Sequence, residues 1–441
     1  MNALSVTRSQ YSGGHDLSHG DDTMIAQVLA QGSVALGADA LDPIDAILDA
    51  VRQHLGMEIA FAARYVEGRR QFTHIRTDLP VPHRPGDSEP NEETYCWHVL
   101  EGRLPELILD AADHPLAQTL PITKALPVGS HMDVPIRLSD GSVHGSFCCL
   151  SRHADRSLTG RDLATLRAFA ALAAVQVESD LKVERGHAVV VDRVENAIIN
   201  GQPAVLLQPV FRLSDGLPAG AEALARFPDA GVRPPSDWFN EAADHGLGEA
   251  LELAAVRAAL AALPFVPAPA YLAINVSPAV AASAALRALL WAAPAGRIVL
   301  EITEHAIVGD YATLREALAP LIGHVRIAID DVGAGYAGLR HILDLQPQLL
   351  KLDIGLVRDL DRDPARRALI EAMVHFAAHI GAGIVAEGVE REEEAAALAD
   401  LGVGYAQGWL YSRALPPVAV SQMFLGATAS AVPFPQLGIA A

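Results

Sequence analysis

The sequence predicts a mixed α/β chain of two domains, in which an α+β domain precedes a (β/α)8-type barrel. The length of 441 residues suits two or three domains. Residues 25–180 combine short strand-like runs with a long last helix, whereas residues 187–426 alternate strand-like runs with alanine-rich helical patterns. About eight such units in roughly 240 residues are typical of a barrel.

We expect five segments along the chain. A polar N-terminal tail without the apolar stretch of a signal peptide precedes the α+β domain, a helical linker joins this domain to the barrel, and a C-terminal tail follows. In this order, the segments are residues 1–24, 25–180, 181–199, 200–426 and 427–441.

The composition excludes several classes of partner. There are 33 Lys and Arg residues against 53 Asp and Glu, and the net charge of −20 argues against a nucleic-acid polymer or an acidic membrane face as the main partner. Three cysteines exclude a disulfide scaffold and fit a reducing compartment, so we expect a cytoplasmic protein. Residues 258–286 are uncharged, but several prolines would break a membrane-spanning helix there.

The first domain begins with a helical pattern and ends in a long helix that starts near Thr159. Asp140-Gly141 signals a hairpin between its last two strands. The expected strands cover residues 59–65, 106–109, 132–136 and 146–150. The long helix carries one apolar stripe, formed by Leu163, Leu166, Phe169, Ala170, Ala173 and Val177.

The second domain contains strands that are mostly continuous apolar runs, as expected when both faces of a sheet are buried. The expected strands cover residues 204–210, 219–226, 270–276, 297–303, 325–331, 348–353 and 383–387, with a short last strand near 404–407.

Polar residues gather where these strands end. Most steps between them correspond to one βα unit of roughly 30 residues, and the first step corresponds to about two units. Because the strands of a barrel end at the same mouth, we expect these residues to form one cup. Its members are Glu222, Asn275, Glu301, Asp330, Asp331, Lys351 and Glu387.

Such a concentration of carboxylates requires cations. Oxygen ligands without a thiol indicate Mg²⁺ or Mn²⁺ rather than zinc. The adjacent Asp330 and Asp331 suit two ions, an arrangement that serves displacement at a phosphodiester. Lys351 is a candidate for orienting the attacking water or neutralising charge that develops during the reaction.

Residues 200–417 resemble the EAL family of cyclic di-GMP phosphodiesterases. The resemblance rests on Gln208-Pro209, Glu222-Ala-Leu-Ala-Arg226, Asn275-Val-Ser, Glu301-Ile-Thr-Glu304, Asp330-Asp-Val-Gly-Ala-Gly-Tyr, Lys351-Leu-Asp353, Glu387-Gly-Val-Glu390 and Gln407-Gly. It implies a modified barrel that hydrolyses cyclic di-GMP to linear pGpG with two Mg²⁺ or Mn²⁺. Val332 and the loop Ala-Gly-Tyr-Ala-Gly depart from the family pattern next to the metal ligands, which puts rate and control in doubt more than competence.

The resemblance also implies individual roles. Glu222, Asn275, Glu301 and Asp330 would bind the first metal, and Asp330 would bridge to a second metal that Asp331 also binds. Lys351 and Glu387 would position the nucleophilic water, and Glu304 would anchor the loop that starts at Asp330. The residues implied to line the substrate groove are Gln208, Leu224, Arg226, Asp353 and Gln407.

The first domain resembles a GAF sensor module more loosely, through Glu93-Thr-Tyr-Cys96, Leu109-Asp-Ala, Asp133-Val-Pro-Ile and Asp140-Gly-Ser-Val-His-Gly-Ser. These residues indicate a fold and leave the ligand unknown. Cys96 is a candidate redox or haem-linked site, but the favoured interpretation is that all three cysteines are small buried side chains. No histidine is assigned to a metal.

We therefore expect a phosphodiesterase that a GAF sensor regulates, with a non-hydrolysing cyclic di-GMP receptor as the main alternative. A barrel enzyme that abstracts a proton with Mg²⁺ and Lys351, or a purely structural protein, fits the ligand set less well. We also expect a homodimer in which the apolar stripes of two exit helices pair. The competing interpretation is that each stripe packs on its own sheet.

Overall fold

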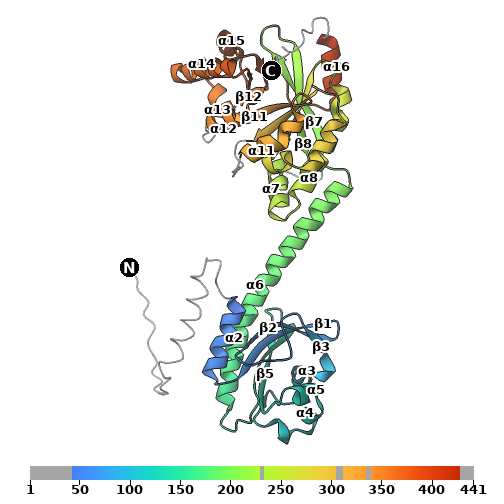
Figure 1. Cartoon of the computed structure of the whole chain (residues 1–441), viewed down its shortest axis with the longest axis vertical. Coiled ribbons are helices and arrows are strands. Elements are labelled where there is room, and N and C mark those ends of the chain that lie inside the picture. The colour runs from blue at the N-terminus through green and yellow to red at the C-terminus, as the bar shows by residue number, and fades with distance from the viewer. Residues whose placement is uncertain (1–41, 229–232, 304–310, 334–338, 428–441) are drawn as a thin grey trace, which may run out of the picture. The chain divides into compact units, whose positions relative to one another are not determined.

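The chain folds as two compact units, one up to Arg185 and one from Gly186, and each is described by itself (Figure 1). The computed structural model describes residues 42–228, 233–303, 311–333 and 339–427. The predicted N-terminal tail lies outside these residues, as does almost all of the predicted C-terminal tail.

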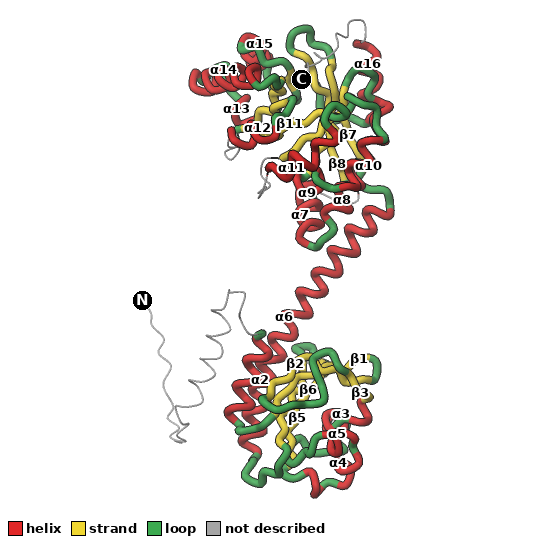
Figure 2. Tube along the Cα trace, in the orientation of Figure 1, coloured by secondary structure: helices red, strands yellow, loops and turns green. Residues whose placement is uncertain are grey.

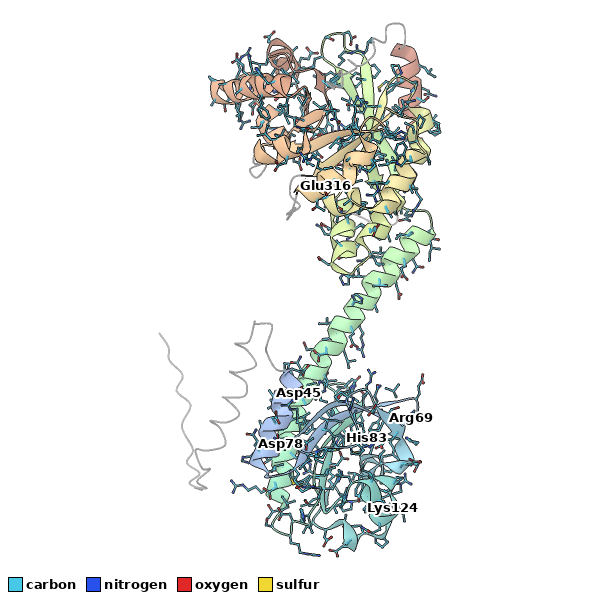
Figure 3. The ribbon with its side chains drawn as sticks, in the orientation of Figure 1. Asp45, Arg69, Asp78, His83, Lys124 and Glu316 are labelled. Atoms are coloured by element: carbon cyan, nitrogen blue, oxygen red, sulfur yellow. The ribbon has the colours of Figure 1, made fainter. Side chains whose placement is uncertain are left out.

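The first unit is built on an antiparallel sheet, which has six strands within the described residues, in the order β3-β2-β1-β6-β5-β4. Helices α2 (Pro43–His54) and α6 (Gly160–Ile199) cover one face, and α3 (Tyr95–Leu100), α4 (Pro115–Thr119) and α5 (Pro121–Ala125) lie toward the other face (Figure 2). Asp45 on α2 and Lys124 on α5 mark these two sides in Figure 3. The strands are β1 (Ile59–Val66), β2 (Arg69–Thr77), β3 (Ser88–Pro90), β4 (Leu107–Ile108), β5 (Ser130–Arg137) and β6 (Val143–Ser151).

The predicted strands of this unit are confirmed as β1, β4, β5 and β6, and the hairpin at Asp140-Gly141 joins β5 to β6. Gly141 has φ +84°, a conformation that favours glycine. Sequence reasoning missed β2 and β3. The apolar residues of β2 are interrupted by arginines and other polar side chains, so the strand shows no apolar run.

The predicted apolar stripe of α6 packs on the sheet of its own chain. Leu166, Phe169, Ala173 and Val177 belong to one buried cluster with α2 and with the facing side chains of the sheet. The expectation that this stripe pairs with a second exit helix is therefore wrong, because one apolar face can be buried only once.

The second unit is a closed barrel, whose strands within the described residues follow the order β10-β11-β12-β13-β14-β7-β8-β9. The predicted strands are confirmed. They are β7 (Ala204–Arg212), β8 (Pro218–Arg226), β9 (Tyr271–Val276), β10 (Ile298–Thr303), β11 (Arg326–Val332), β12 (Leu349–Leu352), β13 (Gly383–Ala386) and β14 (Tyr405–Ala406).

One strand runs against the others. β7 is antiparallel to both of its neighbours, β14 and β8, and Ala204 at its start lies opposite Arg226 at the end of β8. The expectation of about two units between Glu222 and Asn275 is also wrong, because β8 pairs directly with β9 and the connection simply contains two helices.

Helices cover the outside of the barrel (Figure 2) and bury its main apolar core between themselves and the strands. The last turns of α6 also belong to this unit, where Val194 and Ala197 pack with Phe227 and Trp238. The helices are α7 (Pro235–Asp244), α8 (Gly248–Ala262), α9 (Pro278–Ala281), α10 (Ala284–Trp291), α11 (Tyr311–Leu318), α12 (Leu339–Leu345), α13 (Ile354–Val357), α14 (Pro364–His379), α15 (Glu392–Asp400) and α16 (Pro417–Ala427). Among the described residues, no helix has both the length and the apolar character needed to cross a bilayer.

Candidate active site

The polar cup stands on an apolar floor inside the barrel. Successive residues of a strand point to opposite faces, so residues two apart face the same way. Five strands each place a small or apolar side chain in the floor and a polar one two positions later. The pairs are Ala273 and Asn275, Val299 and Glu301, Ala328 and Asp330, Leu349 and Lys351, and Val385 and Glu387.

Lys351 stands at the centre of the cup, with its side chain only 2% exposed. Its Nζ lies 2.7 Å from Glu387 Oε1, 2.8 Å from Glu301 Oε2 and 3.0 Å from Asp330 Oδ1. Glu222 Oε2 is slightly farther, at 3.6 Å. The structure thus brings together Lys351 and four of the predicted carboxylates from five different strands and strand ends.

Two amide side chains donate hydrogen bonds to the carboxylate of Glu222. Asn275 Nδ2 donates to Glu222 Oε1 over 2.7 Å, and Gln407 Nε2 donates to Glu222 Oε2 over 2.6 Å. Gln407 Nε2 also lies 3.2 Å from Gln208 Oε1, whose own amide donates to the carbonyl of Ser412. The reversed strand β7 therefore contributes Gln208 to the same cup.

A backbone irregularity turns Asp331 toward the cup. Strict alternation would point Asp330 and Asp331 to opposite faces of β11. However, the register with β12 shifts between Ile329 and Val332, and Asp331 has φ +57°, which is uncommon for a residue other than glycine. Oxygen atoms of Asp330, Asp331 and Glu387 consequently lie within 4.8 Å of one another.

The electrostatics of the cup follow from burial and crowding. Burial raises the pKa of Glu301 well above its ordinary value and that of Glu387 to about 8. Burial lowers the pKa of Lys351, but the surrounding carboxylates outweigh this effect and the pKa stands well above its ordinary value. Burial raises the pKa of Glu222, yet Lys351 and the two amides bring it below the usual value. The cup is therefore short of positive charge.

Divalent cations fit this donor set. Within the described residues, five carboxyl groups and one ammonium meet here, and two divalent cations would cancel the four excess negative charges that remain when all five carboxyl groups are ionised. The donors are carboxylate and amide oxygens without sulfur, which suits Mg²⁺ or Mn²⁺. The grouping of Asp330, Asp331 and Glu387 is close enough for all three to contact one ion.

The predicted groove residues lie at the mouth. Leu224 and Arg226 follow Glu222 on β8 at steps of two, and Asp353 follows Lys351 in the same way. Arg226 Nη1 donates to its neighbouring carbonyl, and Asp353 caps α13 by accepting from the N–H of Gly355. Glu304 and the loop 334–338 lie outside the described residues.

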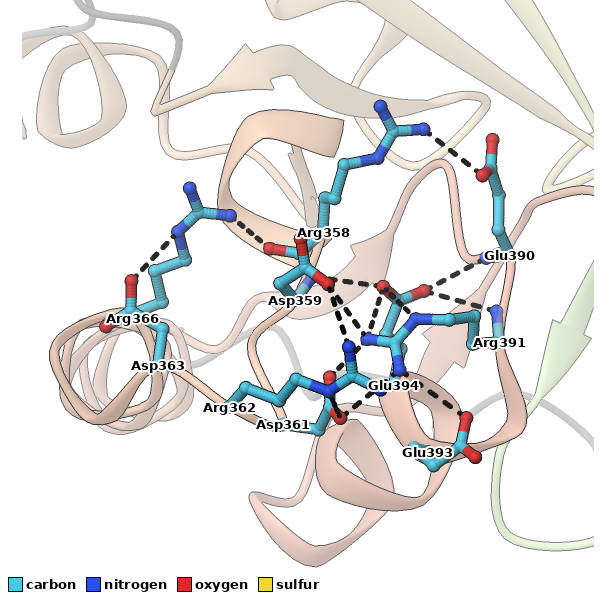
Figure 4. A network of polar contacts seen from close by, with 10 residues as sticks. All are labelled: Arg358, Asp359, Asp361, Arg362, Asp363, Arg366, Glu390, Arg391, Glu393 and Glu394. Carbon is cyan, nitrogen blue, oxygen red and sulfur yellow. Dashed lines mark hydrogen bonds and ion pairs between the residues drawn. The ribbon is translucent and has the colours of Figure 1, made fainter.

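Sequence reasoning missed an ion-pair network around Glu394, which includes Glu390 in the loop after β13 (Figure 4). Buried Glu394, on α15, accepts hydrogen bonds from the backbone N–H groups of Asp359, Glu390 and Arg391 at 3.0–3.2 Å. Its carboxylate thereby ties the loop after β13, which carries Glu387, to the segment after α13. The spacing of Arg391 and Glu394 at the start of a helix is the signal that was available.

Comparisons with known proteins agree with this geometry. Residues 191–414 match the family model described as EAL domain, and residues 39–177 match that of the GAF domain. The cyclic di-GMP phosphodiesterase RocR of Pseudomonas aeruginosa is 34% identical over 238 residues, which are 51% of this chain and 60% of RocR. The probable cyclic di-GMP phosphodiesterase PdeB of Escherichia coli is 32% identical over 244 residues, covering 51% of this chain and 45% of PdeB.

Both relatives are thus matched over less than two thirds of their own length. Among solved structures, the EAL enzyme Bd1971 in its cAMP- and cyclic di-GMP-bound form has a TM-score of 0.50 at 17% identity, covering 83% of this chain and 93% of that chain. At this identity the likeness concerns the fold alone.

Proposed function

The chain belongs to the EAL domain family, and on this premise we propose that it hydrolyses cyclic di-GMP to linear pGpG. The observation that carries the proposal is the ring of carboxylates around Lys351 at the barrel mouth, with Asn275 and Gln407 holding Glu222. The names of RocR and PdeB as phosphodiesterases of this dinucleotide support the choice of substrate.

Two Mg²⁺ or Mn²⁺ ions, when bound, would lower the pKa of a water and clamp the scissile phosphate. We assign Glu222, Asn275, Glu301 and Asp330 to the first ion and Asp330 and Asp331 to the second, and Glu387 also lies within reach of the second. The bulge that turns Asp331 beside Asp330 supports the bridging role of Asp330.

Lys351 and Glu387 are proposed to position the attacking water. Their side chains are 2.7 Å apart, and Lys351 also contacts Glu301 and Asp330, so its ammonium is held over the reacting centre from several sides. Gln208, Leu224, Arg226, Asp353 and Gln407 would bind the rest of the dinucleotide, with the Arg226 guanidinium on the second phosphate. Glu304 keeps its proposed role as anchor of the loop after Asp330.

We further propose that the GAF unit regulates the barrel through α6, and that the working form is a homodimer. The continuity of α6 from Gly160 to Ile199 supports the first part, since one helix belongs to both units. The dimer has to use a surface other than the apolar stripe, which is buried in the GAF core.

The test is turnover of cyclic di-GMP by the full chain. We expect pGpG with Mg²⁺ or Mn²⁺, loss of turnover in EDTA, and inhibition by Ca²⁺, which prefers more ligands and longer bonds. Binding of cyclic di-GMP without turnover in either ion would instead identify a receptor. Undiminished turnover after removal of all metal would contradict the two-metal assignment.

A further inference from the structure

A second cluster of metal-ligating side chains lies inside the first unit. We propose that Cys96, His131 and Cys148 bind a zinc ion there, with Asp133 as a neighbouring carboxylate. All four side chains are buried, with exposures of 0–2%. This site is independent of the proposed hydrolysis in the barrel.

The sheet register brings these residues together. Asp133 on β5 pairs directly with Cys148 on β6, and His131 lies two positions before Asp133 on the same face. Cys96 reaches this face from α3. Cys149 points to the opposite face, where it packs in the core beneath α2 and α6, so adjacent cysteines have different environments.

The donor atoms lie within 4.8 Å of one another. The Sγ atoms of Cys96 and Cys148 are 2.9 Å apart, which is longer than a disulfide bond of about 2.05 Å. A ring nitrogen of His131 lies within 4.8 Å of both sulfurs, and Asp133 Oδ1 lies 2.5 Å from Cys148 Sγ. Within the described part of the chain, the buried Nδ1 of His131 has no hydrogen-bond partner.

The surrounding charge favours a divalent cation. Buried Arg70 donates from Nη1 to Cys96 Sγ over 2.9 Å. Two thiolates, the Asp133 carboxylate and the Glu89 carboxylate that pairs with Arg70 carry four negative charges, of which one divalent ion and the Arg70 guanidinium would cancel three. Thiolate and imidazole donors select zinc over the magnesium or manganese expected in the barrel.

An apolar cavity adjoins the site on the side of Arg70 and His131. It measures about 40 Å³ and is lined by Phe61, Phe72 and Leu126 among others, and by His83, which Figure 3 labels. This small volume favours an ion over the haem for which Cys96 was a candidate. The ion would therefore lie beside a small, mostly apolar space.

Cobalt titration of the full chain tests the proposal. The protein is stripped of metal under reducing conditions and titrated with Co²⁺, and we expect a sulfur-to-cobalt charge-transfer band that saturates at one equivalent and disappears on addition of one equivalent of Zn²⁺. The barrel cannot produce this band, because every cysteine of the chain precedes residue 150.

Matched variants locate the site. Cys96→Ser, Cys148→Ser and His131→Asn should each weaken or abolish the band, whereas Cys149→Ser should retain it. Absence of the band from the folded wild-type chain would overturn the proposal without reference to any variant. A Cys96–Cys148 disulfide that persists in reductant, or loss of the band with Cys149→Ser alone, would overturn it as well.

Discussion

Lys351 is the residue on which the proposed chemistry depends most directly. Its ammonium contacts Glu301, Asp330 and Glu387, so it is well placed to act on a water held between these carboxylates. In the metal-free chain it also supplies the positive charge that lets them approach one another.

Lys351→Ala should lower kcat by about 10²–10⁴-fold, the usual contribution of a positioned acid or base, and leave the affinity for cyclic di-GMP nearly unchanged. Lys351→Arg should not restore the rate, because a planar guanidinium does not fit a space closed on several sides by carboxylates. Single-turnover kinetics and calorimetric titration with Ca²⁺ separate the two quantities. A parallel loss of affinity and rate would reassign Lys351 to substrate binding.

Asp331 is a second residue whose substitution can be predicted. Its backbone has φ +57°, which limits the residues that can replace it without strain. Asn tolerates this conformation, so Asp331→Asn removes the charge without adding strain. We expect kcat with Mn²⁺ to fall by at least about 100-fold while the thermal stability of the metal-free chain stays the same or rises, because one repelling carboxylate is lost.

The control for this change is Glu316→Gln, which alters an exposed carboxylate on α11 (Figure 3). It should leave both rate and stability unchanged. Full activity of Asp331→Asn at saturating Mn²⁺ would show that the second ion does not need this residue.

At the scale of elements, the loop after β13 depends on the network of α15 (Figure 4). Three backbone N–H groups from two separate segments converge on the carboxylate of Glu394. We expect this contact to help position Glu387, because Glu387 begins the loop that Glu394 holds at Glu390 and Arg391.

Glu394→Gln should destabilise the barrel by about 1–3 kcal/mol, since an amide N–H₂ faces donors that it cannot satisfy. It should also lower kcat, because Glu387 is then less well fixed. Thermal unfolding and turnover measure both effects. The neighbouring Glu393, whose side chain is 65% exposed, supplies the control: Glu393→Gln should be close to neutral. Equal effects of the two changes would contradict the anchoring role.

Most barrel strands and the cup could be predicted from sequence because two signals coincide there: a run of apolar residues and a polar residue at its end. The direction of β7 was missed, although Asp215-Gly216 between β7 and β8 is the same hairpin signal as Asp140-Gly141 in the first unit. The direction of β7 was missed because all strands of a regular (β/α)8 barrel are expected to be parallel.

The cysteine cluster could not be predicted in the same way. His131 and Cys148 lie on the two strands of one hairpin, but Cys96 comes from a helix 52 residues before Cys148, and none of the three shows the short spacing of a metal motif. The orientation of Asp331 toward the cup could not be predicted either, because a bulge depends on the register between β11 and β12 rather than on local sequence.

At the scale of the whole chain, α6 has two separate tasks. Its first half completes the core of the GAF unit, and its last turns pack on the barrel beside Phe227 and Trp238. A substitution that disrupts the core of the GAF unit should therefore leave the barrel folded.

Phe169→Glu tests this separation. Phe169 is 2% exposed in the GAF core, so a charge at this position should cost on the order of 4 kcal/mol or more and unfold that unit. The exposed neighbouring position supplies the control Ala171→Glu, which should be neutral. Calorimetry should show loss of one transition, with the barrel transition and Mn²⁺-dependent turnover retained. Simultaneous loss of both transitions would show that the units unfold together.

The reversed strand β7 has a consequence for the proposed regulation of the barrel. A first strand parallel to its neighbours would bring the preceding chain in beneath the apolar floor, far from the reacting groups. Because β7 runs the other way, α6 enters at the rim where Ala204 lies opposite Arg226, and Gln208 follows four residues later. In the proposed regulation, a change in the pose of the last turns of α6 would therefore act on the mouth of the barrel without crossing the core. In the proposed regulation, the same point of entry would serve any upstream domain that ends in a helix.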